Sequence, residues 1–376
     1  MKLPAPPTFS SPLHHPRVAT VIGRWLGAAV VICFLTGFYS HLLQDTPSWL
    51  TVPSRPANLY RVTQGVHVIS GTVAVPLLLA KLWTVYPKLF AKPDLKAIGQ
   101  LVERLSILVL VSSMALELFI GFVNTLQWYP WPFPFRQTHY ALAWIIVGAL
   151  LVHLAVKLPL IRANWRRTPE RRLESLPAET TGLTRRGLFR TVAGAAALVG
   201  ITTAGQSATP LGSVAVLAPR KPNIGPQALP VNRTAAAAGV GGIDADWRFT
   251  VAGPRVLSYS LDELRNLPQS RAELPIACVE GWSQGASWEG IRVRDLLELC
   301  GAPAGSRVRV VSMEKGGFYG TSELPADFAA DPLTLLALRL NGSELALDHG
   351  FPARIIAPNR PGVLQTKWVH RLEVVA

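Results

Sequence analysis

The stretch Leu274-Pro275-Ile276-Ala277-Cys278-Val279-Glu280-Gly281-Trp282-Ser283 places a single cysteine directly after a short apolar run. The run is typical of a β-strand, and the residues that follow it are typical of a loop. A thiol at the end of a strand suits a soft metal or a nucleophilic sulfur, but it also suits a small buried apolar residue. The decapeptide by itself therefore leaves both a metal site and a packing role open.

A second stretch favours the metal site. Asp348-His349-Gly350-Phe351-Pro352-Ala353-Arg354 is followed thirteen residues later by Lys367-Trp368. Together with the cysteine loop, this pattern resembles the molybdenum-cofactor domain of the sulfite oxidase family. The resemblance implies a mixed α+β molybdopterin-binding domain in which the Cys278 thiolate ligates molybdenum and is the catalytic centre.

The same resemblance implies a set of residues that hold the pterin and its phosphate. Arg354 would supply a planar fork and Lys367 a point charge, which is a suitable pair for a buried phosphate. The full set is Asn232, Arg233, His349, Arg354, Gln365, Thr366 and Lys367.

The cysteine loop also bears on the substrate. Sulfite oxidases carry an arginine five residues after the metal ligand, where it holds the anionic substrate, and Ser283 stands at that position here. The loop is instead similar to the periplasmic methionine-sulfoxide reductase catalytic subunit. The resemblance implies a small S- or N-oxide as the oxo-transfer substrate, with Glu280 and Trp282 lining the pocket. A structural salt bridge is the alternative role for Glu280.

The composition indicates a membrane protein. The mean hydropathy is +0.28, and only 16% of the residues are charged. Residues 1–221 hold 22 Lys and Arg against 7 Asp and Glu, whereas residues 222–376 hold 15 against 16. The net charge of +14 therefore belongs to segments that flank apolar helices, which excludes a nucleic-acid partner.

Four apolar segments cover residues 19–42, 62–86, 105–127 and 137–159, each near the roughly 20 residues that cross a bilayer. Basic residues gather before the first segment, between the second and third, and after the fourth. Because positive flanks stay in the cytoplasm, we expect a multi-pass inner-membrane protein with a cytoplasmic N-terminus.

A fifth span is expected after the basic stretch Thr184-Arg185-Arg186-Gly187-Leu188-Phe189-Arg190, because the next 29 residues carry no charge. The basic stretch also resembles a twin-arginine export signal, and a plain stop-transfer flank is the alternative. With either interpretation, the chain after Arg220 is extracytoplasmic. The predicted domains are thus residues 1–165, 166–221 and 222–376.

Within the last domain, alternation of apolar residues predicts strands at 247–251 and 307–311, and residues 260–267 and 293–299 read as short helices. The three cysteines Cys33, Cys278 and Cys300 make no disulfide framework. A Cys278–Cys300 bridge is an alternative that would consume the metal ligand. The chain ends at Ala376 without the family's dimerisation domain, so a monomer is expected.

Histidines in the apolar segments predict haem ligands. His139 and His153 are fourteen residues apart on the fourth segment, which is within about 40° of four full turns and about 21 Å along the axis. They therefore share one helix face at two depths. His67, on the second segment, matches the depth of His139, so these two are predicted to bracket an outer haem iron.

The inner haem is less well defined. The partner of His153 must come from the cytoplasmic side, where His14 and His15 are available, and we choose His14. His41 competes as an outer ligand. The layout resembles the cytochrome b561 type and the membrane subunits of formate dehydrogenases, although Trp25 replaces a usual histidine on the first helix.

The sequence therefore predicts a four-helix transmembrane haem-binding bundle, a fifth transmembrane helix and a sulfite-oxidase-type domain. Electrons would pass between quinol, one or two haems b and an extracytoplasmic molybdenum centre. An oxidase that delivers electrons to quinone, a cofactor-free binding module on a cytochrome b anchor, and a cytochrome that serves another partner remain alternatives.

Overall fold

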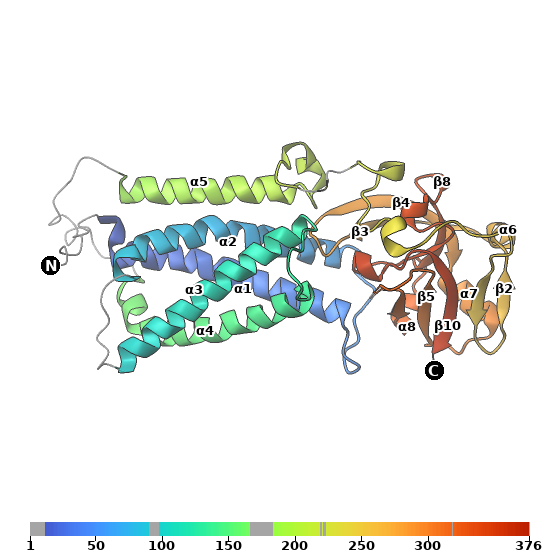
Figure 1. Ribbon diagram of the computed structural model, residues 1–376, viewed down its shortest axis with the longest axis horizontal. Helices are drawn as coiled ribbons and strands as arrows, with labels where there is room; N and C mark the ends of the chain where they lie inside the picture. The colour runs from blue at the N-terminus through green and yellow to red at the C-terminus, as the bar shows by residue number, and fades with distance from the viewer. Residues whose placement is uncertain are drawn as a thin grey trace. The chain divides into compact units, whose positions relative to one another are not determined.

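The computed structural model describes residues 12–89, 98–165, 183–218, 220, 223–317 and 319–375. The chain divides into two compact units (Figure 1). Unit 1 comprises Met1–Leu35 and His67–Thr203, and unit 2 comprises Thr36–Val66 and Ala204–Ala376. Basic flanking residues in 90–97 and 166–182, on which the predicted topology partly rests, lie outside the described residues.

Five long helices follow one another from the N-terminus, and all five are long and apolar enough to cross a membrane. They are α1 (Pro16–Gln44), α2 (Leu59–Leu89), α3 (Ile98–Thr125), α4 (Phe135–Ala163) and α5 (Arg185–Ala204). The first four cover the four predicted apolar segments, except that α3 ends two residues before the third segment does, which confirms the prediction of helices there.

The fifth helix is shorter than the uncharged stretch that predicted it. It begins at Arg185 and ends at Ala204, fifteen residues before Pro219. At Gly205 the chain passes so close to Leu211 that a Cβ would lie 2.3 Å from the Leu211 carbonyl oxygen. The chain therefore turns sharply there, which an apolar run does not reveal.

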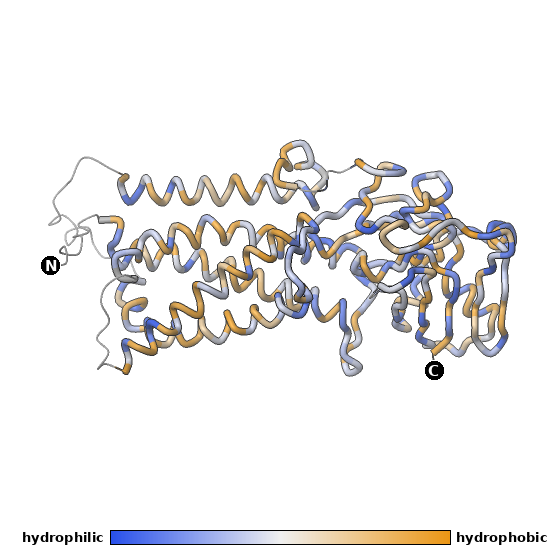
Figure 2. The backbone as a smooth tube through the Cα atoms, viewed as in Figure 1, coloured by the Kyte–Doolittle hydropathy of each residue, from blue (hydrophilic) through white to orange (hydrophobic). Residues whose placement is uncertain are grey.

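In unit 1, residues from α1, α2, α3 and α4 share one apolar cluster that includes Leu26, Ala74, Leu110 and Ile146. Other apolar side chains of these helices face outward: Leu79 is 62% exposed and Leu151 is 64% exposed. Figure 2 shows hydrophobic residues along the length of the helices. A helix bundle that is apolar outside as well as inside is typical of proteins surrounded by lipid.

Unit 2 contains two five-stranded sheets. The first has the order β2-β1-β10-β5-β6, in which β1 and β10 are parallel and the other pairs are antiparallel. Its strands are β1 (Phe249–Ala252), β2 (Leu257–Tyr259), β5 (Arg307–Ser312), β6 (Thr321–Leu324) and β10 (Val369–Val375).

The second sheet has the order β3-β4-β7-β8, with β9 also paired to β7. A Cβ on Gly290 would lie 2.1 Å from the Leu336 carbonyl oxygen, so this position in β4 requires glycine. The strands are β3 (Ser270–Ala277), β4 (Ser283–Arg292), β7 (Leu335–Leu340), β8 (Ser343–Glu344) and β9 (Arg354–Ile356).

Three short α-helices lie among the strands: α6 (Leu261–Asn266), α7 (Val293–Cys300) and α8 (Ala326–Ala330). Ser260 and Glu263 form a capping box at the start of α6. The short 3₁₀ helices are Pro12–His14, Thr209–Val214, Pro226–Ala228, Ala236–Ala238, Leu347–His349 and Gly362–Leu364. The two predicted strands correspond to β1 and β5 and the two predicted helices to α6 and α7, so the predicted mixed α/β domain is confirmed.

Candidate functional site

Cys278 lies in the tight connection between β3 and β4. The last register pair of this hairpin is Ala277 with Ser283. The Cys278 amide donates to the Trp282 carbonyl at 2.9 Å, and the Gly281 amide donates to the Cys278 carbonyl at 3.0 Å. Gly281 has φ +101°, a conformation that favours glycine. The hairpin thus fixes the predicted metal ligand on a closed loop of five residues.

The thiol is buried, with 1% of Cys278 exposed. Burial raises the pKa of the Cys278 thiol well above its ordinary value, and the Glu280 carboxylate raises it further, whereas the charge of Lys367 lowers it. All three cysteines are free thiols, so the alternative Cys278–Cys300 bridge is absent. A bound cation would displace the proton and convert the thiol into a ligand.

Glu280 and Trp282 lie side by side on the loop. The Trp282 indole Nε1 donates to Glu280 Oε2 at 3.0 Å, and both residues are buried. Glu280 therefore orients an indole ring on the loop that carries the thiol. Ser283 is also buried, and its Oγ has no hydrogen-bond partner among the described residues.

Arg354, at the start of β9, joins two of the predicted cofactor-binding segments. Its Nη1 donates to the His349 carbonyl at 3.0 Å, and its Nη2 donates to the Gln365 carbonyl at 3.1 Å. The guanidinium lies 5.1 Å from the ring centroid of Trp288, a fully buried residue of β4. Arg354 is therefore held as a flat, stacked fork.

Lys367, just before β10, joins two more of the predicted segments. Its Nζ donates to the Asp348 carbonyl at 2.8 Å and to the Arg233 carbonyl at 2.9 Å. The Arg233 guanidinium itself pairs with Glu314 at 2.8 Å. The structure thus brings Arg233 and Lys367 together although 134 positions separate them in the sequence.

Arg354 and Lys367 are both buried, and among the described residues only Lys367 has carboxylates, those of Asp348 and Glu314, whose charges raise its pKa. Burial lowers the pKa of Arg354 to about 9 and that of Lys367 to about 7, where the charge of Arg354 adds to the effect. Burial and the same charge lower the pKa of His349 to about 4. In the part of unit 2 that the structure describes, neither Arg354 nor Lys367 forms an ion pair with a carboxylate. An anion bound here would relieve the cost of buried positive charge.

The remaining predicted cofactor residues line the same region. Gln365 donates to the Arg360 carbonyl at 3.1 Å, and its Oε1 is buried without a partner in the described chain. Thr366 Oγ1 lies 2.7 Å from Ser322 Oγ. His349 Nε2 lies 2.8 Å from the Pro226 carbonyl, so that nitrogen is already engaged. Asn232 is half-buried beside Arg233.

These observations test whether the site fits a molybdopterin. A buried thiol stands near a buried lysine, and Arg354 Nε and Gln365 Oε1 are buried polar atoms that lack partners. A pterin offers donors and acceptors to such atoms, and its phosphate offers the missing anion. The residues fit the cofactor: Cys278 would hold the metal, and Arg354 and Lys367 would hold the phosphate.

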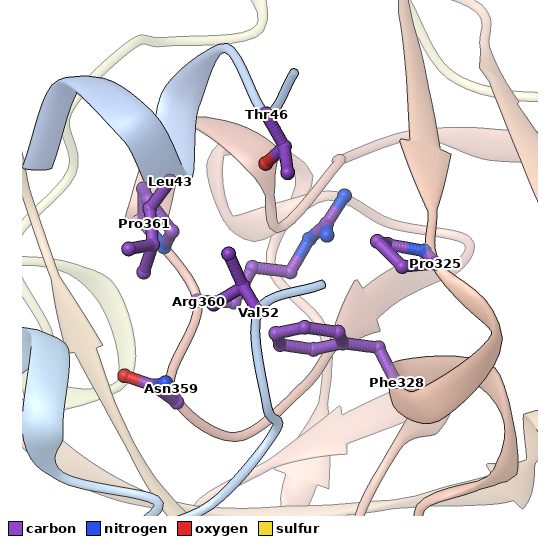
Figure 3. Close-up of a pocket in the computed structure, with 8 residues that line it drawn as sticks. All are labelled: Leu43, Thr46, Val52, Pro325, Phe328, Asn359, Arg360 and Pro361. Carbon is purple, nitrogen blue, oxygen red and sulfur yellow. The ribbon is translucent and has the colours of Figure 1, made fainter. Parts of the chain in front are cut away.

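Two cavities border the described part of unit 2. The first has a volume of about 20 Å³, room for one water, and lies among Leu43, Val52, Phe328 and Arg360 (Figure 3). The second has a volume of about 360 Å³ and lies along the strands that carry the cysteine loop. Its polar lining is Asn58, Arg61, Arg271, Glu273, Ser287 and Asn341.

A separate pair of side chains stands out in unit 1. The ring centroids of His67 and His139 are 6.1 Å apart at an interplanar angle of 83°. His67 Nδ1 lies 2.9 Å from the Cys33 carbonyl, and His139 Nδ1 lies 3.2 Å from Glu117 Oε1. Sequence reasoning predicted the two histidines but missed Glu117, an acidic residue inside an apolar helix that could have been noticed as such.

The predicted inner ligands are not joined in the same way. His14 Nδ1 lies 3.2 Å from the Thr84 carbonyl. His153 Nδ1 is buried without a hydrogen-bond partner among the described residues. The inner pair, and the competing roles of His15 and His41, stay predictions.

The C-terminal part of the chain is similar to known proteins. Residues 237–376 match the family model described as oxidoreductase molybdopterin binding domain. Rat mitochondrial sulfite oxidase is 33% identical over 153 residues, covering 32% of this chain and 27% of that protein. Barley nitrate reductase [NAD(P)H] is 41% identical over 107 residues, covering 25% and 12%. An uncharacterized oxidoreductase of Bacillus subtilis is 30% identical over 132 residues, covering 34% and 64%. The chain thus spans about a quarter of the length of the sulfite oxidase that it matches.

Proposed function

We propose that this chain, an oxidoreductase whose residues 237–376 form a molybdopterin-binding domain of the sulfite oxidase and nitrate reductase type, is a membrane-bound enzyme with its own haem b electron carrier. Electrons from quinol would reach an extracytoplasmic molybdenum centre and reduce a small S- or N-oxide. The observation that carries the haem part of the proposal is the geometry of His67 and His139.

Two imidazoles that would both bind one haem iron must lie close together, with only the metal between them. The separation of 6.1 Å between His67 and His139 agrees with this arrangement. His67 Nδ1 is within hydrogen-bond distance of the Cys33 carbonyl, whereas His139 Nδ1 lies 3.2 Å from Glu117 Oε1 but has no hydrogen-bond partner among the described residues. Nε2 of each ring would be the nitrogen that binds a metal. The residues therefore fit an outer haem b. His153 with His14 is proposed for the inner haem.

Membrane insertion is supported by the five apolar helices and by their outward-facing leucines. The basic residues flank helix ends, as the positive-inside rule requires for a cytoplasmic N-terminus. The twin-arginine stretch at 184–190 forms the first turns of α5, which begins at Arg185. We infer from its sequence that the C-terminal domain is exported after its cofactor is inserted.

At the catalytic centre, the molybdenum cofactor would supply two-electron chemistry and oxo transfer. The protein residues bind and orient. Cys278 would hold the metal, and Arg354 and Lys367 would hold the phosphate. The hydrogen bond from Trp282 to Glu280 orients the indole ring on the loop that carries the thiol. The overall reaction takes up two electrons and two protons and releases the reduced sulfide or amine and water.

The neutral Ser283 hydroxyl favours an uncharged oxide over an anion, because a buried oxyanion needs charge-assisted hydrogen bonds. A second candidate function is oxidation of an anion such as sulfite, with electrons delivered to quinone. The identity of 33% with a sulfite oxidase favours it.

The test uses the full-length protein, purified in detergent after expression with molybdopterin synthesis intact. We expect one molybdenum and two haems b per chain, measured by metal analysis and by the pyridine haemochrome spectrum. Reduced benzyl viologen should be oxidised on addition of dimethyl sulfoxide or trimethylamine N-oxide. Sulfite-dependent haem reduction instead would favour the second function. Active protein without molybdenum would refute both.

A further inference from the structure

The segment 52–66 lies outside the residues that match the molybdopterin family, yet it is built into unit 2. Val52 and Tyr60 are buried in the same apolar cluster as Phe249 and Val251 of β1. Figure 3 shows Val52 beside Arg360 and Phe328. This segment, which includes the first turns of α2, is therefore part of the core that supports the cysteine loop.

Polar contacts fix the position of this segment. The Asn359 side chain accepts from the Tyr60 amide at 2.8 Å and donates to the Pro53 carbonyl at 2.9 Å. Arg55 binds Asp331 through both of its carboxylate oxygens, at 2.8 and 2.9 Å. The first turn of α2 and the segment that precedes it are thus both anchored before the chain reaches Gln64.

Two residues then reach the cysteine loop itself. Gln64 Nε2 donates to the Val279 carbonyl at 2.9 Å, and Ser207 Oγ donates to the Gly281 carbonyl at 3.0 Å. A Cβ on Gly65 would lie 3.1 Å from Ser207, so glycine allows the two segments to meet. The Ser283 amide also donates to the Gln206 carbonyl at 2.8 Å.

The buried Gln64 amide is unfavourable for the stability of the fold. Gln64 is 5% exposed, and its Oε1 has no hydrogen-bond partner among the described residues. A buried carbonyl oxygen without a hydrogen-bond partner is destabilising, and an apolar side chain at position 64 would not carry one. What the amide adds is a bond to the peptide carbonyl immediately after the metal-ligating residue.

We propose that Gln64 is a positioning residue for the Cys278 thiolate, with Ser207 as a second clamp on the same loop. The inference rests on the proposed role of Cys278 as the molybdenum ligand. The two side chains hold the Val279 and Gly281 carbonyls and so fix the direction in which the loop presents its sulfur. Without Gln64, the Val279 carbonyl would lose the side-chain bond that fixes its direction, and the loop would present the Cys278 sulfur differently although the cofactor would remain bound.

The test compares Gln64→Met with the wild type and with Gln44→Met in the full-length protein. Methionine matches glutamine in length but cannot donate. Gln44 is a suitable control because it lies in unit 2 and its side-chain amide donates to Ser40, on its own helix. The readouts are molybdenum content, the Mo(V) electron paramagnetic resonance spectrum after partial reduction, and kcat and KM for dimethyl sulfoxide with benzyl viologen.

We expect Gln64→Met to keep its molybdenum, to show shifted Mo(V) g-values, and to lose about tenfold in kcat with KM unchanged, whereas Gln44→Met matches the wild type. If Gln64→Met loses the metal or fails to fold, Ser207→Ala, which removes one hydroxyl, decides by the same spectrum. A wild-type Mo(V) spectrum in the metal-containing variant overturns the inference and leaves the proposed function standing. Wild-type protein without molybdenum overturns the proposed function instead.

Discussion

Replacing Arg354 by lysine tests the centre of the proposed cofactor site. The substitution keeps the positive charge but removes the planar fork. Arg354 Nη1 and Nη2 bind two carbonyls, those of His349 and Gln365, which lie on different segments. Lysine has a single ammonium group on a shorter side chain, so it cannot donate to both carbonyls in this geometry.

The expected cost follows from the contacts. A hydrogen bond from a charged donor contributes about 1.5–3 kcal/mol, and stacking of the guanidinium on buried Trp288 contributes about 1–2 kcal/mol. Loss of one bond and most of the stacking should destabilise unit 2 by about 2–4 kcal/mol. For a domain of this size, that corresponds to a decrease in Tm of roughly 5–12 °C.

The assay follows thermal unfolding by tryptophan fluorescence and measures molybdenum per chain in the same samples. Arg339→Lys is the matched control, because Arg339 is about half-exposed and pairs with Glu289 on the surface. That pair should contribute no more than about 1 kcal/mol. We expect Arg354→Lys to lower both Tm and molybdenum content and Arg339→Lys to leave both near wild type. Full molybdenum and an unchanged Tm in Arg354→Lys would refute the assigned role of the fork.

Three further predictions concern other parts of the molecule. Cys278→Ala should abolish turnover with dimethyl sulfoxide and leave the haem spectrum intact; persistent turnover would mean that the metal assignment is wrong. Glu117→Gln should retain haem but raise its midpoint potential by about 59 mV, which is a tenfold change in the redox equilibrium. The reason is that a neutral amide beside His139 would make its imidazole a weaker electron donor to the haem iron. An unchanged potential in redox titration would show that the Glu117 contact is structural only. The folded-state pKa of Lys367, about 7, is below its ordinary value of 10.5, so the unfolded chain binds the proton more tightly. The destabilisation that the buried charge of Lys367 causes is thus fully present below pH 7 and is relieved as the pH rises toward 10. Cofactor-free protein should have a higher Tm at pH 9 than at pH 7. Lys367→Met should remove the contribution of Lys367 to this difference.

The helices were accessible to sequence reasoning because each is a long apolar run of a length set by the bilayer. The spacing of fourteen residues placed His139 and His153 on one helix face, because each residue of a helix adds a fixed rotation about its axis. Strand alternation located β1 and β5. These features depend on neighbours a few positions away, which the sequence displays directly.

The end of α5 was not predicted from the sequence. No charge follows Ala204, but Gly205 directly follows the helix and Pro210 lies six residues beyond its end, a stop signal that the uncharged run concealed. At Gly205 a Cβ would lie 2.3 Å from the Leu211 carbonyl oxygen. Glu117 was missed for a similar reason. A carboxylate in an apolar helix signals function, but only the folded bundle shows that it faces His139 on another helix.

By itself, the sequence determined the number of apolar helices, the charge asymmetry along the chain, and the spacing of cysteine, histidine, arginine and lysine that resembles a molybdenum site. Only the tertiary structure decided that residues 36–66 belong with the C-terminal unit and that Gln64 contacts the loop of Cys278. The physical reason is the distance along the chain. The bond from Gln64 to Val279 joins residues 215 positions apart, and such a contact is selected by packing of the whole domain, for which no local pattern exists.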